Sequence, residues 1–116
     1  MKRDVLVMLT RAPERVHAAE GLRAARGVAA GFDEHDVTVL FTEDAVYAAR
    51  RAVDRDALNL PDHIAELHAG GGRMVADGAA LEARGIDPSE IADDIEVLDG
   101  GAAAGLVHDA DHTLDF

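Results

Sequence analysis

Short apolar runs alternate with helix-forming stretches along the chain, and this alternation limits the fold more than any other feature. The runs lie at 4–10, 37–42, 74–76, 95–98 and 111–116, and their lengths suit strands better than core helices. Strands that alternate with helices form parallel sheets with right-handed crossovers. The sequence therefore predicts one α/β domain over residues 1–116, with three layers: a five-stranded, mainly parallel sheet and helices on both of its faces.

Helix boundaries carry their own signals. Pro13 and Pro61 suit the first turn of a helix, where the missing N–H is harmless. Residues 43–50 are expected to begin another helix, and Asp87-Pro88-Ser89-Glu90 has the arrangement of a capping box. After Pro13, apolar residues recur at helical steps, and Gly31 is predicted to end that helix. A second, narrower apolar stripe lies around Pro61. The first set is Ala18, Leu22, Ala25, Ala29 and Phe32, and the second is Leu60, Ile64 and Leu67.

The stretch 73–86, RMVADGAALEARGI, predicts a strand that turns directly into a helix. Asp77 and Gly78 form the turn, and Gly85 can adopt the left-handed conformation that ends a helix. Asp77 has two interpretations. It is either an N-cap, which accepts an N–H from the first helical turn, or a carboxylate that acts as a base or a ligand.

The carboxyl ends of parallel strands share one edge of the sheet, where binding sites of α/β proteins gather. Arg11 and open helix N-termini there suit an anion, although Arg11 can equally pair with a neighbouring acid. Gly100-Gly101 precedes a helix but lacks the full glycine spacing of a nucleotide-binding turn. The candidate pocket residues are Thr10, Arg11, Thr42, Glu43, Asp44, Tyr47, Asp77, Gly78, Gly100 and Gly101.

The chain is strongly acidic, with a net charge of −12 from 23 acids and 11 bases. Lys2 is its only lysine. Such a surface suits a cytosol at molar salt, where the Debye length of about 3 Å screens repulsion between carboxylates. We therefore expect a halophilic source. The urea midpoint should rise between dilute and molar KCl, and an unchanged midpoint would contradict this expectation. The charge also argues against nucleic-acid binding, because no basic patch is present.

Other features narrow the function further. The chain has no Cys, which excludes thiol nucleophiles and zinc–thiolate sites within it. His63 and His68 do not share a helical face, and His108 and His112 fall in an expected turn, so we predict no metal site and no cofactor. Because no apolar run approaches the ~20 residues that cross a bilayer and no signal peptide is apparent, we expect a cytoplasmic protein.

Two stretches, 37–50 (VTVLFTEDAVYAAR) and 73–86, resemble the DsrE/DsrF/TusD-like sulfur-relay family. The resemblance implies a five-stranded, flavodoxin-like sheet. In that family the loop at the second stretch often carries a sulfur-accepting Cys, and the matching position here is Asp77. Family members assemble as hexamers of one subunit or of related subunits, and some subunits lack the acting Cys.

The resemblance thus implies a Cys-free subunit with a structural or partner-binding role in a sulfur-relay oligomer. Its partners would be itself, related subunits or a Cys-bearing paralogue. A carboxylate cannot carry a persulfide, so this chain's own side chains cannot transfer sulfur. One alternative is a protein that binds a small anion or nucleotide in the strand-end pocket around Arg11, Asp44 and Asp77. Another is an enzyme that depends on the Asp77 carboxylate and would show a raised Asp77 pKa.

Overall fold

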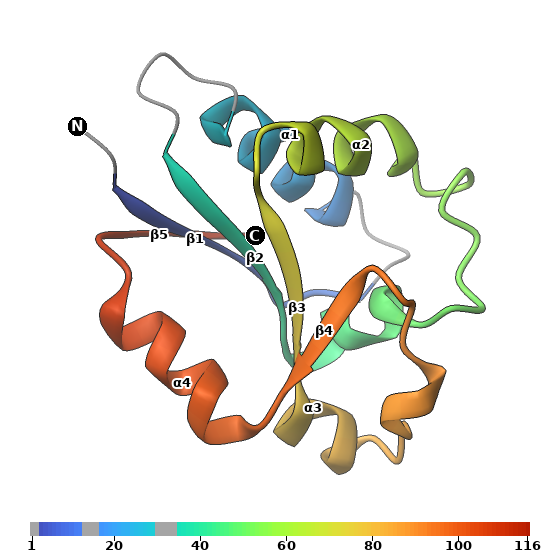
Figure 1. Cartoon of the computed structure of the whole chain (residues 1–116). Coiled ribbons are helices and arrows are strands. Elements are labelled where there is room, and N and C mark those ends of the chain that lie inside the picture. Colours follow the sequence, from blue (N-terminus) through green and yellow to red (C-terminus); the bar gives the residue numbers. More distant parts are fainter. Residues whose placement is uncertain (1–2, 13–16, 30–34) are drawn as a thin grey trace.

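The computed structural model describes residues 3–12, 17–29 and 35–116, which build a five-stranded sheet flanked by helices (Figure 1). The strands are β1 (Asp4–Leu9), β2 (Asp36–Phe41), β3 (Arg73–Asp77), β4 (Ile95–Leu98) and β5 (His112–Asp115). The α-helices are α1 (His17–Ala29), α2 (Pro61–Ala69), α3 (Gly78–Ala83) and α4 (Gly100–Asp109). Two 3-10 helices are η1 (Glu43–Ala49) and η2 (Pro88–Glu90).

The strand pairs are all parallel, in the order β4-β3-β2-β1-β5. The α/β class and the five strands predicted from the sequence are therefore confirmed. The order differs from the 2-1-3-4-5 order of flavodoxin itself, because here the last strand, rather than the second, lies outside β1. The first four strands follow one another across the sheet, and the connection through α4 returns to the opposite side.

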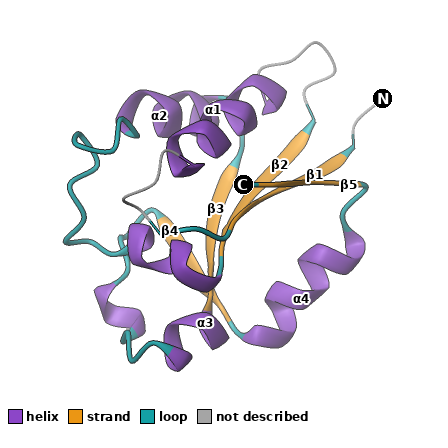
Figure 2. Cartoon of the chain, turned by 180° about the vertical axis from the view of Figure 1, so that it is seen from behind, coloured by secondary structure: helices purple, strands orange, loops and turns teal. Residues whose placement is uncertain are grey.

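This topology places the helices in two unequal layers, because right-handed crossovers in opposite directions lie on opposite faces. One face carries α1 and α2, whereas α4 lies on the other (Figures 1 and 2). The larger core joins the α1 side of the sheet to Leu22, Leu67 and Leu81. The smaller core joins Ala103 of α4 to buried sheet residues, which are Leu6, Leu40 and Val75.

Most helix signals are confirmed. Pro61 is the first residue of α2, and Ala18, Leu22, Ala25, Ala29, Leu60, Ile64 and Leu67 are buried. The capping box at Asp87 is present in full, although it starts a 3-10 turn and not an α-helix. Residues 43–49 also form a 3-10 helix. Pro13, Gly31 and Phe32 lie outside the described residues. Within the described part of the chain, every helix is too short or too polar to cross a bilayer.

Arginines fasten the two long connections to each other. Arg55 forms a two-pronged contact with the Asp94 carboxylate, at 2.7 and 2.6 Å, and this contact holds the pKa of Asp94 below its usual value. Arg51 donates to the carbonyls of Ser89 and Ile91, at 3.0 and 3.1 Å. The poorly periodic stretch that follows η1 is therefore tied to the segment before β4.

His63 of α2 leads to a prediction about pH. Its Nδ1 is buried and has no hydrogen-bond partner in the described structure. Desolvation lowers the pKa of His63, Arg26 and Arg23 of α1 lower it further, and Asp62 and Glu66 oppose the shift. Because the folded state disfavours the proton, the contribution of neutral His63 to stability is complete above the unfolded pKa of about 6.5 and is lost as pH falls below it.

We expect the free energy of unfolding to fall less steeply for His63→Gln than for the wild type as pH drops from 7 to 5. Urea titrations at several pH values measure this slope. Parallel slopes for the wild type and His63→Gln would contradict the assignment.

Candidate functional site

Asp77 joins two neighbouring strands at the carboxyl edge of the sheet. It ends β3 and caps α3: its Oδ1 accepts the N–H of Ala79 at 3.0 Å. Its Oδ2 accepts the hydroxyl hydrogen of Thr42 at 2.8 Å, and Thr42, which follows β2, is only 8% exposed. Both carboxylate oxygens of Asp77 are thus used within the protein. The N-cap interpretation of Asp77 is confirmed.

The turn after β2 adds two carboxylates beside this corner. Glu43 is exposed and has a left-handed backbone, with φ of 48°, which is uncommon for a residue other than glycine. Asp44 Oδ1 accepts from the Nη2 and Nε of Arg84 at 3.1 Å each, and Arg84 also donates to the Ala80 carbonyl at 3.2 Å. Arg84 therefore ties α3 to the turn after β2.

Tyr47 contacts Arg50 and not the corner formed by Asp77. It is half-buried in η1, and the guanidinium of Arg50 lies 5.2 Å from the centre of its ring. The Nε of Arg50 also donates to the Tyr47 carbonyl at 2.9 Å. These contacts order the end of η1. They join Tyr47 to the connection after η1. In the described structure, no hydrogen bond links its side chain to Asp77.

Glycines allow β4 and the next helix to approach α3 closely. A Cβ on Gly78 would lie 2.6 Å from the carbonyl oxygen of Leu98, the last residue of β4. A Cβ on Gly100 would lie 3.0 Å from that of Ala79. Gly101 is exposed. The sequence analysis missed Asp99, whose Oδ1 accepts from the Ala102 N–H at 2.8 Å and caps α4.

Thr10 directly follows β1 and forms hydrogen bonds with Phe116, the residue after β5. Its N–H and its hydroxyl both donate to the Phe116 carbonyl, at 3.0 and 3.2 Å. Arg11, the next residue, is exposed. The structure therefore joins Thr42 with Asp77 and brings Gly78 next to the end of β4, whereas Thr10 is bound toward β5. Carboxylates dominate this edge: Glu43, Asp44, Asp77 and Asp99.

A cavity that sequence reasoning missed lies at the opposite, amino-terminal edge of β1 to β3. Its volume is about 360 Å³, and α4 forms one wall. It is lined by Asp4, Val5, Leu6, Asp36, Val37, Thr38, Gly71, Arg73, Leu106, Asp109 and Ala110. No candidate residue of the sequence analysis lines it. The sequence held no signal for it, because the cavity arises from how α4 crosses the sheet.

Removal of the Asp77 side chain should destabilise the fold. Asp77→Ala loses an N-cap, which contributes about 0.5–2 kcal/mol, and deprives the buried Thr42 hydroxyl of its acceptor. We expect the free energy of unfolding to fall by roughly 2 kcal/mol, as measured by urea denaturation.

Asp77→Asn keeps an acceptor oxygen for the Ala79 N–H and should lose less than Asp77→Ala. Adding Thr42→Val to Asp77→Ala should cause less loss than the two single changes together, since the two side chains share one hydrogen bond. Strict additivity would show that the bond between Thr42 and Asp77 contributes nothing.

Comparison with known proteins agrees with this architecture. A model of the DsrE/DsrF-like family matches residues 3–116. The crystal structure of the ychN protein from E. coli is similar, with a TM-score of 0.79, 21% identity and full coverage of both chains. A protein of unknown function from Methanobacterium thermoautotrophicum, MTH1491, superposes with a TM-score of 0.70 at 18% identity, again over both full chains. No curated protein gives a significant match.

The parallel sheet and its capped strand-to-helix corner define a small α/β domain with a group of carboxylates at the carboxyl edge of the sheet. Because the family match extends over nearly all of the sequence, the chain belongs to the DsrE/DsrF-like family.

Proposed function

We propose that this chain is a non-catalytic subunit that binds partner chains in a sulfur-relay-type oligomer. The observation that carries the proposal is the state of Asp77. The resemblance of residues 73–86 to the family assigns Asp77 to the position of the sulfur-accepting Cys, and both of its oxygens accept hydrogen bonds from within the fold. A carboxylate bonded in this way caps a helix, and it has no thiol that could accept sulfur. The absence of Cys from the whole sequence supports the same conclusion.

Binding of an anion or a nucleotide at this corner has less support. Glu43, Asp44, Asp77 and Asp99 place negative charge at the ends of β2, β3 and β4, and Arg84 is engaged by Asp44. An anionic ligand would meet repulsion from these groups. A thermal shift with phosphate or ATP in molar KCl would favour ligand binding over the subunit role.

The decisive experiment is the recovery of the tagged protein from its native host in molar KCl, followed by mass determination by light scattering. We expect an assembly of this chain with itself or with a related chain that carries Cys at the corner. As a control, Asp77→Asn should assemble as the wild type does. A chain that stays monomeric at high concentration and that recovers no related subunit would overturn the proposed role.

A further inference from the structure

The two faces of the sheet are covered unequally. Of the described helices, α1, α2 and η1 lie against one face, and α4 alone lies against the other (Figures 1 and 2). It begins after β4, ends before β5 and contacts β1, β3 and β4, so it crosses the sheet obliquely. Such a crossing leaves the amino-terminal parts of β2, β3 and β4 without a helix above them.

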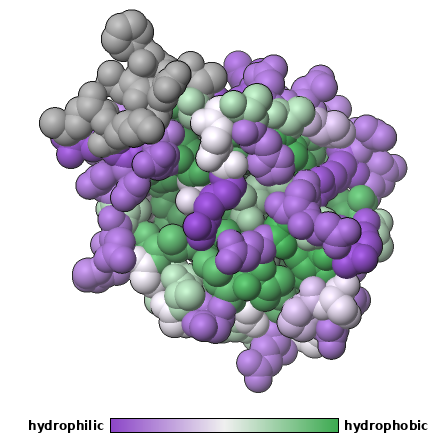
Figure 3. Space-filling model, in the orientation of Figure 1, coloured by the Kyte–Doolittle hydropathy of each residue, from purple (hydrophilic) through white to green (hydrophobic). Residues whose placement is uncertain are grey.

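The cavity of about 360 Å³ lies at the side of this open region nearest β1, and it extends from β1 to β3. Thr38 of β2 and Arg73 of β3 line it from the sheet, and Leu106 lines it from α4. Thr38 and Leu106 are half-buried, so apolar and weakly polar surface remains accessible there. Figure 3 shows apolar surface around a few hydrophilic side chains near the middle of the molecule. In a three-layer fold, such a position is ordinarily covered by another helix.

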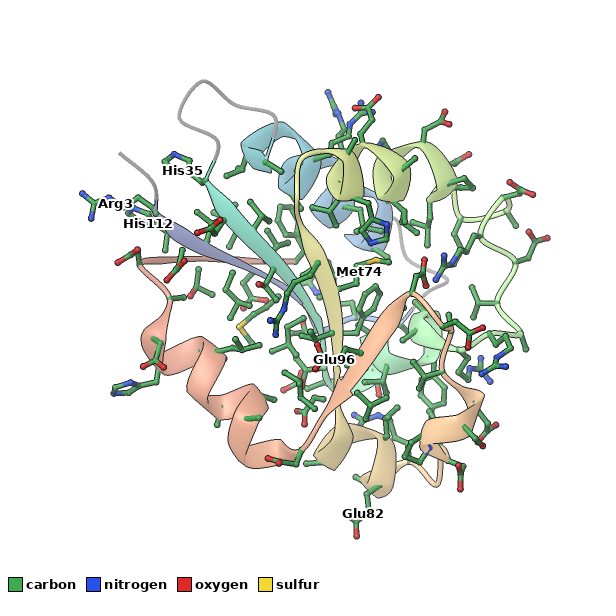
Figure 4. All side chains as sticks on the ribbon, viewed as in Figure 1. Arg3, His35, Met74, Glu82, Glu96 and His112 are labelled. Atoms are coloured by element: carbon green, nitrogen blue, oxygen red, sulfur yellow. The ribbon has the colours of Figure 1, made fainter. Side chains whose placement is uncertain are left out.

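Two opposite charges stand on this face. Alternation along a strand places Arg73 on the same face as Val75, which packs toward α4, and the register pairs Val75 with Glu96 of β4. Both Arg73 and Glu96 are exposed, and Figure 4 labels Glu96 on β4. In the described structure, neither side chain forms an ion pair or a hydrogen bond.

We propose that this open face, formed by Thr38, Arg73, Glu96 and Leu106, is the surface through which two copies of the chain pack. The inference rests on the proposed subunit role and specifies its contact. A two-fold axis makes such an interface self-complementary: each Arg73 lies against Glu96 of the other copy. Side chains of the second copy fill the cavity that α4 leaves.

Charge explains why a second copy suits this face. Two chains of net charge −12 repel each other over most of their surfaces. A guanidinium and a carboxylate on one face give a symmetric contact two attractive pairs. Asp4, Asp36 and Asp109 also line the cavity, and their charges oppose the approach. Salt screens that repulsion, so association should be stronger in molar KCl than in dilute buffer.

Charge reversal tests the proposal by sedimentation or light scattering in molar KCl. Arg73→Glu and Glu96→Arg should each weaken self-association by roughly tenfold, because each places like charges opposite each other at short range, where molar salt screens them only in part. The double variant restores both pairs and should associate within about threefold of the wild type. Urea denaturation confirms that each variant is folded. Arg73→Gln and Glu96→Gln replace any variant that is not.

Arg23→Glu on α1 and Glu82→Arg on α3 (Glu82 is labelled in Figure 4) make the same charge changes at exposed positions away from this face and should leave association unchanged. Single variants that associate like the wild type, or a double variant as weak as the singles, would overturn the inference while leaving the subunit role intact. A monomeric wild type would overturn the inference as well. The subunit role would then depend on recovery of a related Cys-bearing chain.

Discussion

Phe41→Ala should lower the free energy of unfolding by about 3–5 kcal/mol, the usual range for deletion of a buried Phe side chain. Phe41 is 1% exposed and is the bulkiest of the fully buried side chains. It ends β2, where its register partners are Leu9 of β1 and Ala76 of β3. Much of the surrounding core is Ala, which offers little side chain to move into the space. Urea denaturation in molar KCl measures the loss.

Two further variants serve as controls for Phe41→Ala. Phe41→Leu keeps most of the volume and should lose no more than about 1.5 kcal/mol. Leu114→Ala changes a side chain that is 37% exposed on β5 and should stay within about 0.5 kcal/mol of the wild type. A loss below about 1 kcal/mol for Phe41→Ala would mean that the core around the end of β2 is loosely packed.

Gly78→Ala should also destabilise the protein, by about 1–3 kcal/mol. The added methyl would lie 2.6 Å from the carbonyl oxygen of Leu98 and 3.5 Å from the Cα of Asp99. Both neighbours are backbone atoms that belong to the end of β4 and the cap of α4, so relief requires these elements to move. We expect a lower urea midpoint with an unchanged dependence on urea concentration.

Gly105→Ala is the matched control for Gly78→Ala. Gly105 lies inside α4, and a Cβ there would meet no atom within 4 Å. Ala is favoured over Gly in a helix by up to about 1 kcal/mol, so this variant should be more stable than the wild type. Equal effects of the two substitutions would show that α3 and β4 are farther apart than the structure places them.

Local sequence patterns predicted most helices and strands, but they could not predict which strands lie next to each other in the sheet. Apolar runs located the strands, Pro61 located a helix start, and Asp87 with Glu90 formed the predicted capping box. The position of β5 beside β1 follows from the path of α4 across the sheet, which no local pattern records. Residues 43–49 were expected to be α-helical and form a 3-10 helix; Thr42, at the N-cap position, makes no side-chain capping bond.

In the candidate site, too, local contacts could be predicted from the sequence and long-range contacts could not. Asp77 was predictable as a cap because its partner, Ala79, is two residues away. The bond from Thr42 to Asp77 spans 35 residues, and the ion pair of Asp44 with Arg84 spans 40. Each depends on β2 lying next to β3. Sequence reasoning could place these residues at one edge of the sheet but could not say which of them would bind to each other.

The order of the strands has a consequence for synthesis on the ribosome. β1 is made before the other strands, yet its outer neighbour is β5, and the Asp4 N–H bonds to Asp111 at a sequence separation of 107 residues. Until β5 emerges, β1 presents an unpaired edge of apolar sequence to other nascent chains. Such an edge is prone to wrong pairing. Expression in a foreign host should therefore benefit from chaperones that shield β1 until β5 has been made.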